Sequence, residues 1–454
     1  MDRLGRLEGN TAQMERREFV RNAAGATAWT ALSASSVLGA NDRVVVGLLG
    51  CGARGPGVMR GMLGAPNTEL AAICDVYDTN AARANQTLAG GKAKTMRDFR
   101  RVLEMKEVDA IYVATPDFWH SIHTVLSLEA GKHVFVEKPF ALTIREGRVM
   151  VEAAARTKKI LMPATQHRSA PHIIEAASMV ASGEIGQIAL VRAWNSRNVD
   201  GMWTKVPDSD PPAGLDWDMF LGPSPKVPFN SGRFLVNWRN FRDCAGGPIT
   251  DFGNHRIDSV YQIMGTKQMP HTISAVGRRI FPENDGDQFD LHVVQYQFQN
   301  FLLEYTADYQ NAFGLGGGRT GMKYYQMSGQ YDRPHGFAFY GSKAALYVDR
   351  LGWELFPEAG RRGGGSGERK FRQGDDASSL HAQSFIKQVR IGTKGEVDDM
   401  SGFRSTSTCH LGTIAARVNH TIQWNEQKDE IPNDPAASRL LTRTFRKPYD
   451  LIKL

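Results

Sequence analysis

Six residues near the start of the chain have the types and spacing of a phosphate-binding loop. The segment Gly50-Cys51-Gly52-Ala53-Arg54-Gly55 follows the apolar run Val44–Leu49 and opens a helical pattern. In such a loop Gly50 allows a tight turn, Gly52 lets backbone N–H groups approach a pyrophosphate, and Gly55 allows close packing of helix and strand. The loop and the helix N-terminus behind it therefore predict a site for a dinucleotide.

An acidic residue stands where the ribose of that dinucleotide would lie. Asp75 comes 25 residues after Gly50 and directly follows the second apolar run. A carboxylate there accepts hydrogen bonds from the ribose diol of an adenosine and repels a 2′-phosphate. We therefore expect NAD as the cofactor, with NADP as the open alternative, and we expect Arg54 to face the pyrophosphate.

The loop belongs to a region in which apolar runs alternate with helical patterns. Continuous apolar runs of this kind are typical of parallel strands covered on both faces, so residues 41–166 are predicted to form a doubly wound α/β domain of the Rossmann type. The predicted strands are Val44–Leu49, Leu70–Cys74, Ala110–Ala114, Val134–Val136 and Ile160–Met162. The predicted helices are Arg54–Leu63, Asn80–Leu88, Arg97–Met105, Ser121–Ala130 and Ile144–Thr157.

Beyond about residue 185 the pattern changes, and residues 167–454 are predicted to form an α+β domain that binds the substrate. Val294 and Tyr296 alternate with Gln295 and Gln297, as in a sheet with one covered face. The predicted strands are Ile188–Ser196, Thr272–Arg278, Phe289–Tyr296, Phe301–Tyr309 and Ala344–Asp349. The predicted helices are His381–Val389 and Leu411–Trp424, and the glycine-rich stretch Gly360–Asp376 is predicted to be a surface loop.

Three further motifs resemble the Gfo/Idh/MocA family of oxidoreductases. They are Thr115-Pro116-Asp117-Phe118-Trp119-His120, Glu129-Ala130-Gly131-Lys132-His133-Val134-Phe135-Val136-Glu137-Lys138-Pro139 and Gly246-Gly247-Pro248-Ile249-Thr250-Asp251-Phe252-Gly253-Asn254-His255-Arg256-Ile257-Asp258. The resemblance implies that the Rossmann domain is followed by a domain with a large, open, mostly antiparallel sheet. It also implies hydride transfer between a nicotinamide and a sugar-type hydroxyl.

The resemblance also implies which residues form the site. The expected catalytic residues are Lys138, Asp251 and His255. The expected cofactor-binding residues are Gly50, Gly52, Ala53, Arg54, Gly55, Asp75, Thr115, Pro116, Trp119, His120, Glu137 and Lys138. The residues expected to contact the substrate are Gln166, Arg168, Trp238 and Arg239, which offer hydrogen-bond donors and an aromatic face to a polyhydroxylated ring.

The chemistry of the three catalytic candidates agrees with these roles. Oxidation of an alcohol needs a base for the hydroxyl proton, and the imidazole of His255, with an ordinary pKa near 6.5, can accept it. Asp251 lies four residues earlier on the same predicted helix, so both side chains face one side. The ammonium of Lys138, beyond the end of a strand, can polarise the oxygen as a ketone develops. A satisfied helix pair for Asp251 and His255, or a surface position for Lys138, is the structural alternative.

Composition and the first forty residues narrow the function further. The chain has 454 residues, a net charge of +7 that is spread along the sequence, and four cysteines without metal-ligand spacing, so neither nucleic-acid binding nor a metal site is expected.

The N-terminal segment has the pattern of an export signal. An uncharged stretch that is rich in alanine, serine and threonine follows the motif Arg16-Arg17-Glu18-Phe19-Val20. Residues 1–40 therefore resemble a twin-arginine export signal, which predicts a periplasmic protein without a membrane span. Buried thiols are favoured over a disulfide for Cys51 and Cys74.

The leading interpretation is an NAD(P)-dependent oxidoreductase that acts on a secondary hydroxyl of a sugar, glycoside or cyclitol and holds its cofactor tightly. The first alternative is a glycosidase that oxidises a ring hydroxyl transiently with bound NAD. The glycosidase branch of the family carries a Gly-Gly…Tyr-Pro-Thr-His pattern, whereas this chain has Gly246-Gly247-Pro248-Ile249-Thr250-Asp251. The second alternative is a non-catalytic sugar- or nucleotide-binding protein. A homo-oligomer formed through the open sheet of the second domain is also expected.

Overall fold

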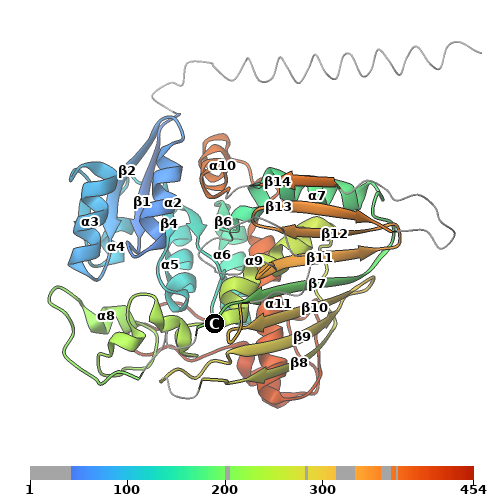
Figure 1. The fold of residues 1–454 in the computed structure, drawn as a ribbon. Coiled ribbons are helices and arrows are strands. Elements are labelled where there is room, and N and C mark those ends of the chain that lie inside the picture. Colours follow the sequence, from blue (N-terminus) through green and yellow to red (C-terminus); the bar gives the residue numbers. More distant parts are fainter. Residues whose placement is uncertain (1–41, 200–204, 282–284, 313–332, 359–369, 375–376) are drawn as a thin grey trace, which may run out of the picture. The chain divides into compact units, whose positions relative to one another are not determined.

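The structure is a computed structural model, and it describes residues 42–199, 205–281, 285–312, 333–358, 370–374 and 377–454 (Figure 1). Residues Val44–Leu454 belong to one compact unit. The expected export signal, residues 1–40, lies outside the described residues.

The first part of the unit contains a sheet of six parallel strands in the order β3-β2-β1-β4-β5-β6. The strands are β1 (Val44–Leu49), β2 (Thr68–Cys74), β3 (Lys94–Met96), β4 (Ala110–Val113), β5 (His133–Val136) and β6 (Leu161–Pro163). The helices between them are α2 (Arg54–Leu63), α3 (Asp78–Ala89), α4 (Phe99–Leu103), α5 (Asp117–Glu129) and α6 (Ile144–Thr157). This strand order confirms the predicted doubly wound fold.

The two faces of the parallel sheet are covered by different parts of the chain. All six residues of β1 are buried, as an apolar strand between two helical layers must be. Helix α10 (Ser378–Ile391) comes from the predicted second domain, yet its residues Ala382, Phe385 and Ile386 pack into the core formed around Val46 and Leu48. The Rossmann layer is therefore completed by a helix that lies more than 200 residues after the last strand of its sheet.

The second sheet has nine described strands in the order β14-β13-β12-β11-β7-β10-β9-β8-β15. They are β7 (Ile188–Ser196), β8 (Thr272–Arg278), β9 (Leu291–Gln297), β10 (Leu302–Asp308), β11 (His335–Gly341), β12 (Ala344–Asp349), β13 (Gly352–Pro357), β14 (Lys370–Gln373) and β15 (Ile422–Gln423). Every neighbouring pair is antiparallel except β7 with β10, which confirms the expected mostly antiparallel sheet.

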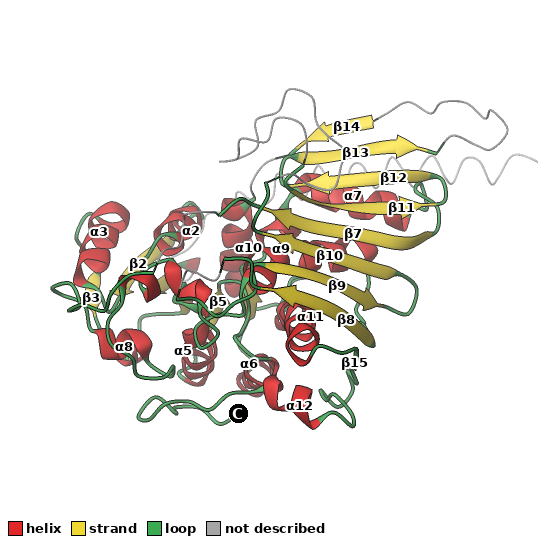
Figure 2. Ribbon diagram, turned by 60° about the horizontal axis from the view of Figure 1, so that its bottom comes forward, coloured by secondary structure: helices red, strands yellow, loops and turns green. Residues whose placement is uncertain are grey.

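Helices cover one face of this sheet and leave the other face open (Figure 2). The covering helices are α7 (Pro171–Ala181), α9 (Pro248–Met264) and α11 (Asp399–Val418). In β9 the side chains of Val294 and Tyr296 are buried whereas those of Gln295 and Gln297 are exposed. The predicted alternation is therefore confirmed, and it results from burial of a single face.

Two of the predicted elements need correction. The helix predicted at Leu411–Trp424 begins at Asp399, where Asp398 and Ser401 form a capping box, and it ends at Val418 because Asn419 adopts a left-handed conformation with φ 57°. Its first half is rich in serine and threonine, so an apolar periodicity could not reveal it. Within the predicted loop Gly360–Asp376, residues Lys370–Gln373 form strand β14. Cys51 and Cys74 are buried free thiols, as predicted.

No helix among the described residues is long and apolar enough to cross a membrane.

Candidate active site

The glycine loop joins β1 to α2 and has the geometry that its spacing predicts. Gly50 has a φ of +90°, and a Cβ there would lie 2.6 Å from the backbone of Ala114. A Cβ on Gly55 would lie 2.2 Å from the carbonyl oxygen of Gly50, whereas a Cβ on Gly52 would meet nothing within 4 Å. Gly50 and Gly55 therefore allow the turn and the packing, and Gly52 leaves open space in front of the loop.

Asp75 holds the loop in place and faces the same space. Its carboxylate accepts hydrogen bonds from the backbone N–H groups of Cys51, at 2.6 Å, and Tyr77, at 2.9 Å. Burial raises the pKa of Asp75, and these hydrogen bonds and the nearby Arg83 oppose the rise. The carboxylate thus fixes the loop at the position where the sequence predicts the ribose contact.

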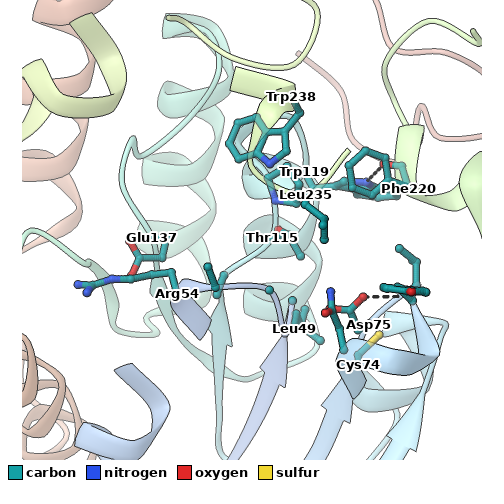
Figure 3. Close-up of a pocket in the computed structure, with 18 of the residues that line it drawn as sticks. Leu49, Arg54, Cys74, Asp75, Thr115, Trp119, Glu137, Phe220, Leu235 and Trp238 are labelled. Carbon is teal, nitrogen blue, oxygen red and sulfur yellow. Dashed lines mark hydrogen bonds and ion pairs between the residues drawn. The ribbon is translucent and has the colours of Figure 1, made fainter. Parts of the chain in front are cut away.

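A cavity of about 550 Å³ begins at this loop and runs along the carboxyl ends of the parallel strands (Figure 3). At one end it is lined by polar residues around Asp75, and at the other by Lys138 and Arg239. The expected site residues that line it are Gly50, Gly52, Ala53, Arg54, Asp75, Thr115, Pro116, Trp119, Glu137, Lys138, Trp238 and Arg239. Most of the residues predicted from sequence to hold the cofactor therefore meet in one cavity, at the edge of the sheet where open α/β folds bind ligands.

Residues 205–243, which we call the covering segment, form the wall of the cavity opposite the strands. The segment contains α8 (Trp217–Leu221) and the short 3-10 helices η4 (Ser231–Arg233) and η5 (Asn237–Asn240). It contributes Met219, Phe220, Phe234, Leu235, Val236, Trp238 and Arg239 to the lining. In Figure 3 the labelled Phe220, Leu235 and Trp238 lie on the side opposite Leu49, Cys74 and Asp75.

The covering segment is bound to the Rossmann layer by backbone and side-chain contacts. Asp78 donates its N–H to the carbonyl of Gly214 at 3.0 Å, and Asp216 donates to Val76 at 2.9 Å. The indole N–H of Trp119 donates to the carbonyl of Phe220 at 3.1 Å. These contacts enclose the cavity with a segment of which the sequence predicted only Trp238 and Arg239 as site residues.

Lys138 and Asp251 form the central contact at the far end of the cavity. Lys138 Nζ lies 2.5 Å from Asp251 Oδ1 and 3.1 Å from the Asp251 carbonyl oxygen. Arg239 Nε lies 3.4 Å from the same carboxylate oxygen. Burial alone would raise the pKa of Asp251, but the charges of Lys138 and Arg239 lower it to about 2. Asp251 is therefore ionised and holds both cations; Lys138 and Arg239 line the cavity, whereas Asp251 lies outside the lining.

His255 lies one turn after Asp251 on α9 and is buried behind the cavity rather than in its lining. Burial, followed by the charge of Lys138, holds the pKa of His255 well below its ordinary value. Its ring lies 5.0 Å from that of His167, and its Nδ1 has no hydrogen-bond partner among the described residues. The imidazole is thus neutral, whereas the sequence argument assumed an ordinary pKa.

Two other expected site residues, His120 and Arg54, have roles that differ from simple ligand contact. His120 does not line the cavity; its ring nitrogens lie 2.8 Å and 2.9 Å from the carbonyl oxygens of Pro139 and Thr115. Arg54 lines the cavity, but its guanidinium binds Glu137 at 3.1 Å and Ser378 at 3.0 Å. His120 therefore positions the two loops that carry Thr115 and Lys138, and Arg54 neutralises Glu137.

The expected substrate residues divide into two pairs. Trp238 and Arg239 line the cavity beside Lys138. Gln166 and Arg168 do not line it, and Arg168 is committed to an ion pair in which its Nε lies 2.9 Å from both carboxylate oxygens of Asp258. Arg168 was predicted to contact the substrate; in the structure it lies outside the cavity lining and is held by a buried carboxylate on α9, and a buried ion pair of this kind is costly to break.

Sequence reasoning missed Asp117 as a site residue. It lies within the motif Thr115–His120, but no spacing rule singles out this position. Asp117 lines the cavity, lies near Lys138 and Arg239, and is only 4% exposed. Asn80 and Arg83 were also missed at the opposite end, because helix α3 directs them at the loop only after the fold has formed.

The residues present fit a dinucleotide. The open space at Gly52 and the helix N-terminus behind it suit a pyrophosphate, and the carboxylate of Asp75 lies at the end of β2 where a ribose diol would lie. Across the part of the chain that the structure describes, no group of three or more His, Cys, Asp or Glu side chains is placed to hold a metal ion.

Comparisons with known proteins agree with this geometry. Residues 44–165 match the family described as "Oxidoreductase family, NAD-binding Rossmann fold", and residues 188–286 and 368–451 match "Oxidoreductase family, C-terminal alpha/beta domain". A structure of levoglucosan dehydrogenase with NADH and levoglucosan has a TM-score of 0.64 at 18% identity, covering 84% of this chain and 99% of that one, which shows a shared fold.

Two curated relatives are similar over a shorter stretch. "D-xylose 1-dehydrogenase (NADP(+))" of Hypocrea jecorina is 38% identical over 175 residues, which are 38% of each chain. "Glycosyl hydrolase family 109 protein 1" of Bacteroides fragilis is 26% identical over 169 residues, which are 36% of each chain. These matches span little more than a third of the curated relatives. Because the two family matches together cover most of its length, the chain belongs to the GFO/IDH/MocA oxidoreductase family and carries that family's NAD-binding Rossmann domain.

Proposed function

We propose that the protein oxidises a secondary hydroxyl of a sugar, glycoside or cyclitol by hydride transfer to a tightly held NAD(P). The observation that carries this proposal is the Lys138–Asp251 pair at the end of the cavity that starts at the glycine loop. A nicotinamide dinucleotide supplies the hydride acceptor when it is bound. The roles of the protein side chains follow from their positions around that end.

Lys138 binds and polarises the substrate oxygen. Its ammonium is directed by Asp251 and borders the cavity, so it stabilises negative charge on the oxygen as the hydroxyl proton leaves. His255 stays neutral because of its burial and the charge of Lys138. A neutral imidazole can accept a proton, and we assign this role to His255; because His255 lies behind the cavity lining, the hydroxyl proton must pass from the Lys138 end of the cavity to reach it. Trp238 and Arg239 then provide an aromatic face and a donor for the ring.

Tight retention of the cofactor is supported by the covering segment. The segment supplies seven residues of the cavity wall and is tied to the Rossmann layer at Gly214, Asp216 and Phe220. Arg446 ties it from the other side, since its guanidinium donates to the carbonyl of Gly222 at 2.9 Å and to that of Ser224 at 3.0 Å. A cofactor beneath such a segment leaves only after these contacts open, which slows its release.

The sugar-type substrate is supported by the named relatives, and a second function remains in view. D-xylose 1-dehydrogenase and levoglucosan dehydrogenase are sugar dehydrogenases by name, which favours net oxidation. The similarity to a protein named as a glycosyl hydrolase favours the alternative, in which oxidation is transient and a glycoside is cleaved. The sequence Gly246–Asp251 differs from the pattern expected of that glycosidase branch, so we rank it second.

We further propose that the protein is exported to the periplasm by the twin-arginine route and assembles there as a homo-oligomer. The motif Arg16-Arg17 supports export, and the exposed Val276 and Val293 on β8 and β9 support pairing of open sheet faces. Replacing both arginines with lysine should retain the precursor in the cytoplasm, and normal export would contradict the proposal. A monomeric mass in light scattering would contradict the assembly.

One experiment separates the proposed activities. Purified protein is incubated with a panel of sugars, cyclitols and aryl glycosides, with and without a second carbonyl compound as electron acceptor. Reduced nicotinamide is followed by absorbance and the aglycone by its colour. An oxidoreductase produces an oxidised sugar without aglycone release, whereas a glycosidase releases aglycone without net reduction. Absence of both products across the panel would favour a binding protein.

A further inference from the structure

Asp117 is a second carboxyl group at the Lys138 end of the cavity. It is the first residue of α5, it is nearly completely buried, and it borders the cavity. Among the described residues, no hydrogen bond or ion pair joins its side chain to another residue. It therefore differs from Asp251, whose carboxylate is committed to Lys138 and Arg239.

The groups around Asp117 include more positive than negative charges. Lys138, after β5, and Arg239, in η5, are cations, and Asp251 on α9 is the one ionised carboxylate that faces them. On its own helix the nearest titratable group is His120, which faces two carbonyl oxygens rather than Asp117. The cluster without Asp117 therefore carries an excess of positive charge.

Glu137 does not correct this excess. Its carboxylate is bound to Arg54 and accepts a hydrogen bond from Tyr112 at 2.8 Å. Burial raises the pKa of Asp117 to about 8, while Arg239 opposes the rise and Asp251 adds to it. Asp117 is thus the carboxyl group at this end of the cavity whose charge can change near neutral pH.

The cofactor changes its charge in the same place. The glycine loop and Asp75 lie at the end of the cavity that suits an adenosine, so a bound dinucleotide would place its nicotinamide ring toward Lys138. The oxidised ring is positive and the reduced ring is neutral. A positive ring beside Lys138 and Arg239 is disfavoured unless an anion lies near it, because charge interactions are strong in a partly dehydrated cavity.

We propose that Asp117 couples its own proton to the redox state of the cofactor, being ionised beside the oxidised nicotinamide and protonated beside the reduced one. In the forward reaction the substrate carbon loses a hydride, which carries two electrons to the nicotinamide, and the hydroxyl oxygen loses a proton. His255 accepts this hydroxyl proton first and Asp117 holds it at the end of the half-reaction, so no proton enters from solvent. Reduction of a second carbonyl compound reverses both transfers, so protons balance inside the site. The inference rests on the proposed function only in requiring a bound nicotinamide dinucleotide.

The test is the midpoint potential of the bound cofactor as a function of pH. The protein with its bound NAD(H) is equilibrated with a redox dye between pH 6.5 and 8.5. Each proton taken up per two electrons lowers the potential by about 30 mV per pH unit. The free nicotinamide couple takes up one proton. The wild type should therefore approach about 60 mV per unit over part of this range, whereas Asp117→Asn should stay near about 30 mV per unit.

Three further variants keep the test decisive. Asp117→Glu retains a carboxyl group and should restore the steeper slope. Asp75→Asn makes the same chemical change at the opposite end of the cavity, so it should weaken oxidised and reduced cofactor alike and keep the wild-type slope. Should Asp117→Asn fail to fold, Asp117→Ser is measured in its place.

Two failures can be told apart. Equal slopes in the wild type and the Asp117 variants would overturn the present inference. If the wild type binds neither NAD nor NADP in either oxidation state, the proposed function itself fails. A steeper slope that persists in Asp117→Asn would assign the second proton to another group and would also reject the inference.

Discussion

The two ends of the cavity are built in different ways. At the adenosine end the site is formed mainly by backbone groups. Gly50, Gly52 and Gly55 shape the loop, and two backbone N–H groups donate hydrogen bonds to Asp75. At the opposite end charged side chains from three separate elements meet around Lys138. The first end is fixed by residues within 25 positions of one another, whereas Lys138 and Asp251 are 113 residues apart.

This difference separates binding from chemistry. At the backbone-built end the contacts expected with the pyrophosphate and the ribose come from the Rossmann layer alone, although the covering segment encloses them. The charged end exists only when α9, η5 and the loop after β5 are correctly packed together. We therefore expect substitutions at the charged end to lower turnover with little loss of bound cofactor. Substitutions at the glycine loop should weaken cofactor binding and leave the catalytic groups in place.

The largest effect is expected at Lys138. Replacing Lys138 with Met removes the ammonium that polarises the substrate oxygen, so kcat should fall by at least about 10³-fold. Bound cofactor should remain near the wild-type amount, because the loop and Asp75 are unchanged. Stopped-flow and steady-state assays measure the first, and nucleotide analysis of the purified variant measures the second. Lys94→Met, which alters an exposed lysine paired with Glu107, is the matched control. Full activity of Lys138→Met would contradict the assignment.

The second-largest loss of kcat is expected at His255, and the pH profile of kcat/KM tests its pKa. His255→Ala should lower kcat by about 10²–10⁴-fold, as loss of a general base does. The folded-state pKa of His255 is depressed, so the neutral form persists as the pH falls through 6.5 and is lost only below that depressed value. The wild-type profile of kcat/KM should therefore show no inflection near pH 6.5. An inflection there that disappears in the variant would show an ordinary pKa. Thermal unfolding distinguishes a structural defect.

Two glycines of the loop should fail in opposite ways. The Cβ of Gly52→Ala would enter open space in front of the loop, so the free protein should keep its stability and lose about tenfold or more in NAD affinity. The Cβ of Gly55→Ala would collide with the Gly50 carbonyl, so the free energy of unfolding should fall by about 1–3 kcal/mol. Denaturant melts and titration with NAD measure both. Equal behaviour of the two variants would reject the distinct roles of the glycines.

The smallest effect concerns the choice of cofactor. Asp75→Ala removes both the ribose acceptor and the charge that repels a 2′-phosphate, so NAD should weaken about tenfold more than NADP. The ratio of the two dissociation constants is the quantity to compare, since loss of the hydrogen bond to Cys51 loosens the loop for both. An unchanged ratio would place the discrimination elsewhere, with Arg83 as the nearest cation in the lining.

The sequence predicted the glycine-loop end of the cavity well, and it predicted the Lys138 end in part. Strand β1 and helices α2 and α6 have the predicted bounds, because a buried apolar strand and an amphipathic helix leave clear periodicities. Lys138, Asp251 and Arg239 were predicted and do meet, although their pairing was not. Burial of His255 could not be predicted, since its pKa depends on neighbours that only the packed domains supply.

Other features were predicted only in part or were missed. The role of Asp117 depends on the charged residues around it, and that of the covering segment depends on its position over the cavity. Residue type alone does not reveal either. Strands β11 and β13 carry no distinctive motif and were missed; β11 pairs with the distant β7, and β13 pairs with β12, which directly precedes it. The predicted domain boundary lies near residue 166. Helix α10 lies after this boundary in the sequence, yet it packs against the Rossmann sheet, so the two parts of the chain share one hydrophobic core there.

The central claim is that the enclosed cavity retains a nicotinamide cofactor through a complete catalytic cycle. The most direct measurement is the cofactor content of protein purified without added nucleotide, obtained by denaturing the preparation and assaying the supernatant for NAD(H) and NADP(H). We expect close to one dinucleotide per chain, in a redox state that sugar and carbonyl substrates can change. A folded preparation that contains no nucleotide and binds added NAD only weakly would contradict it.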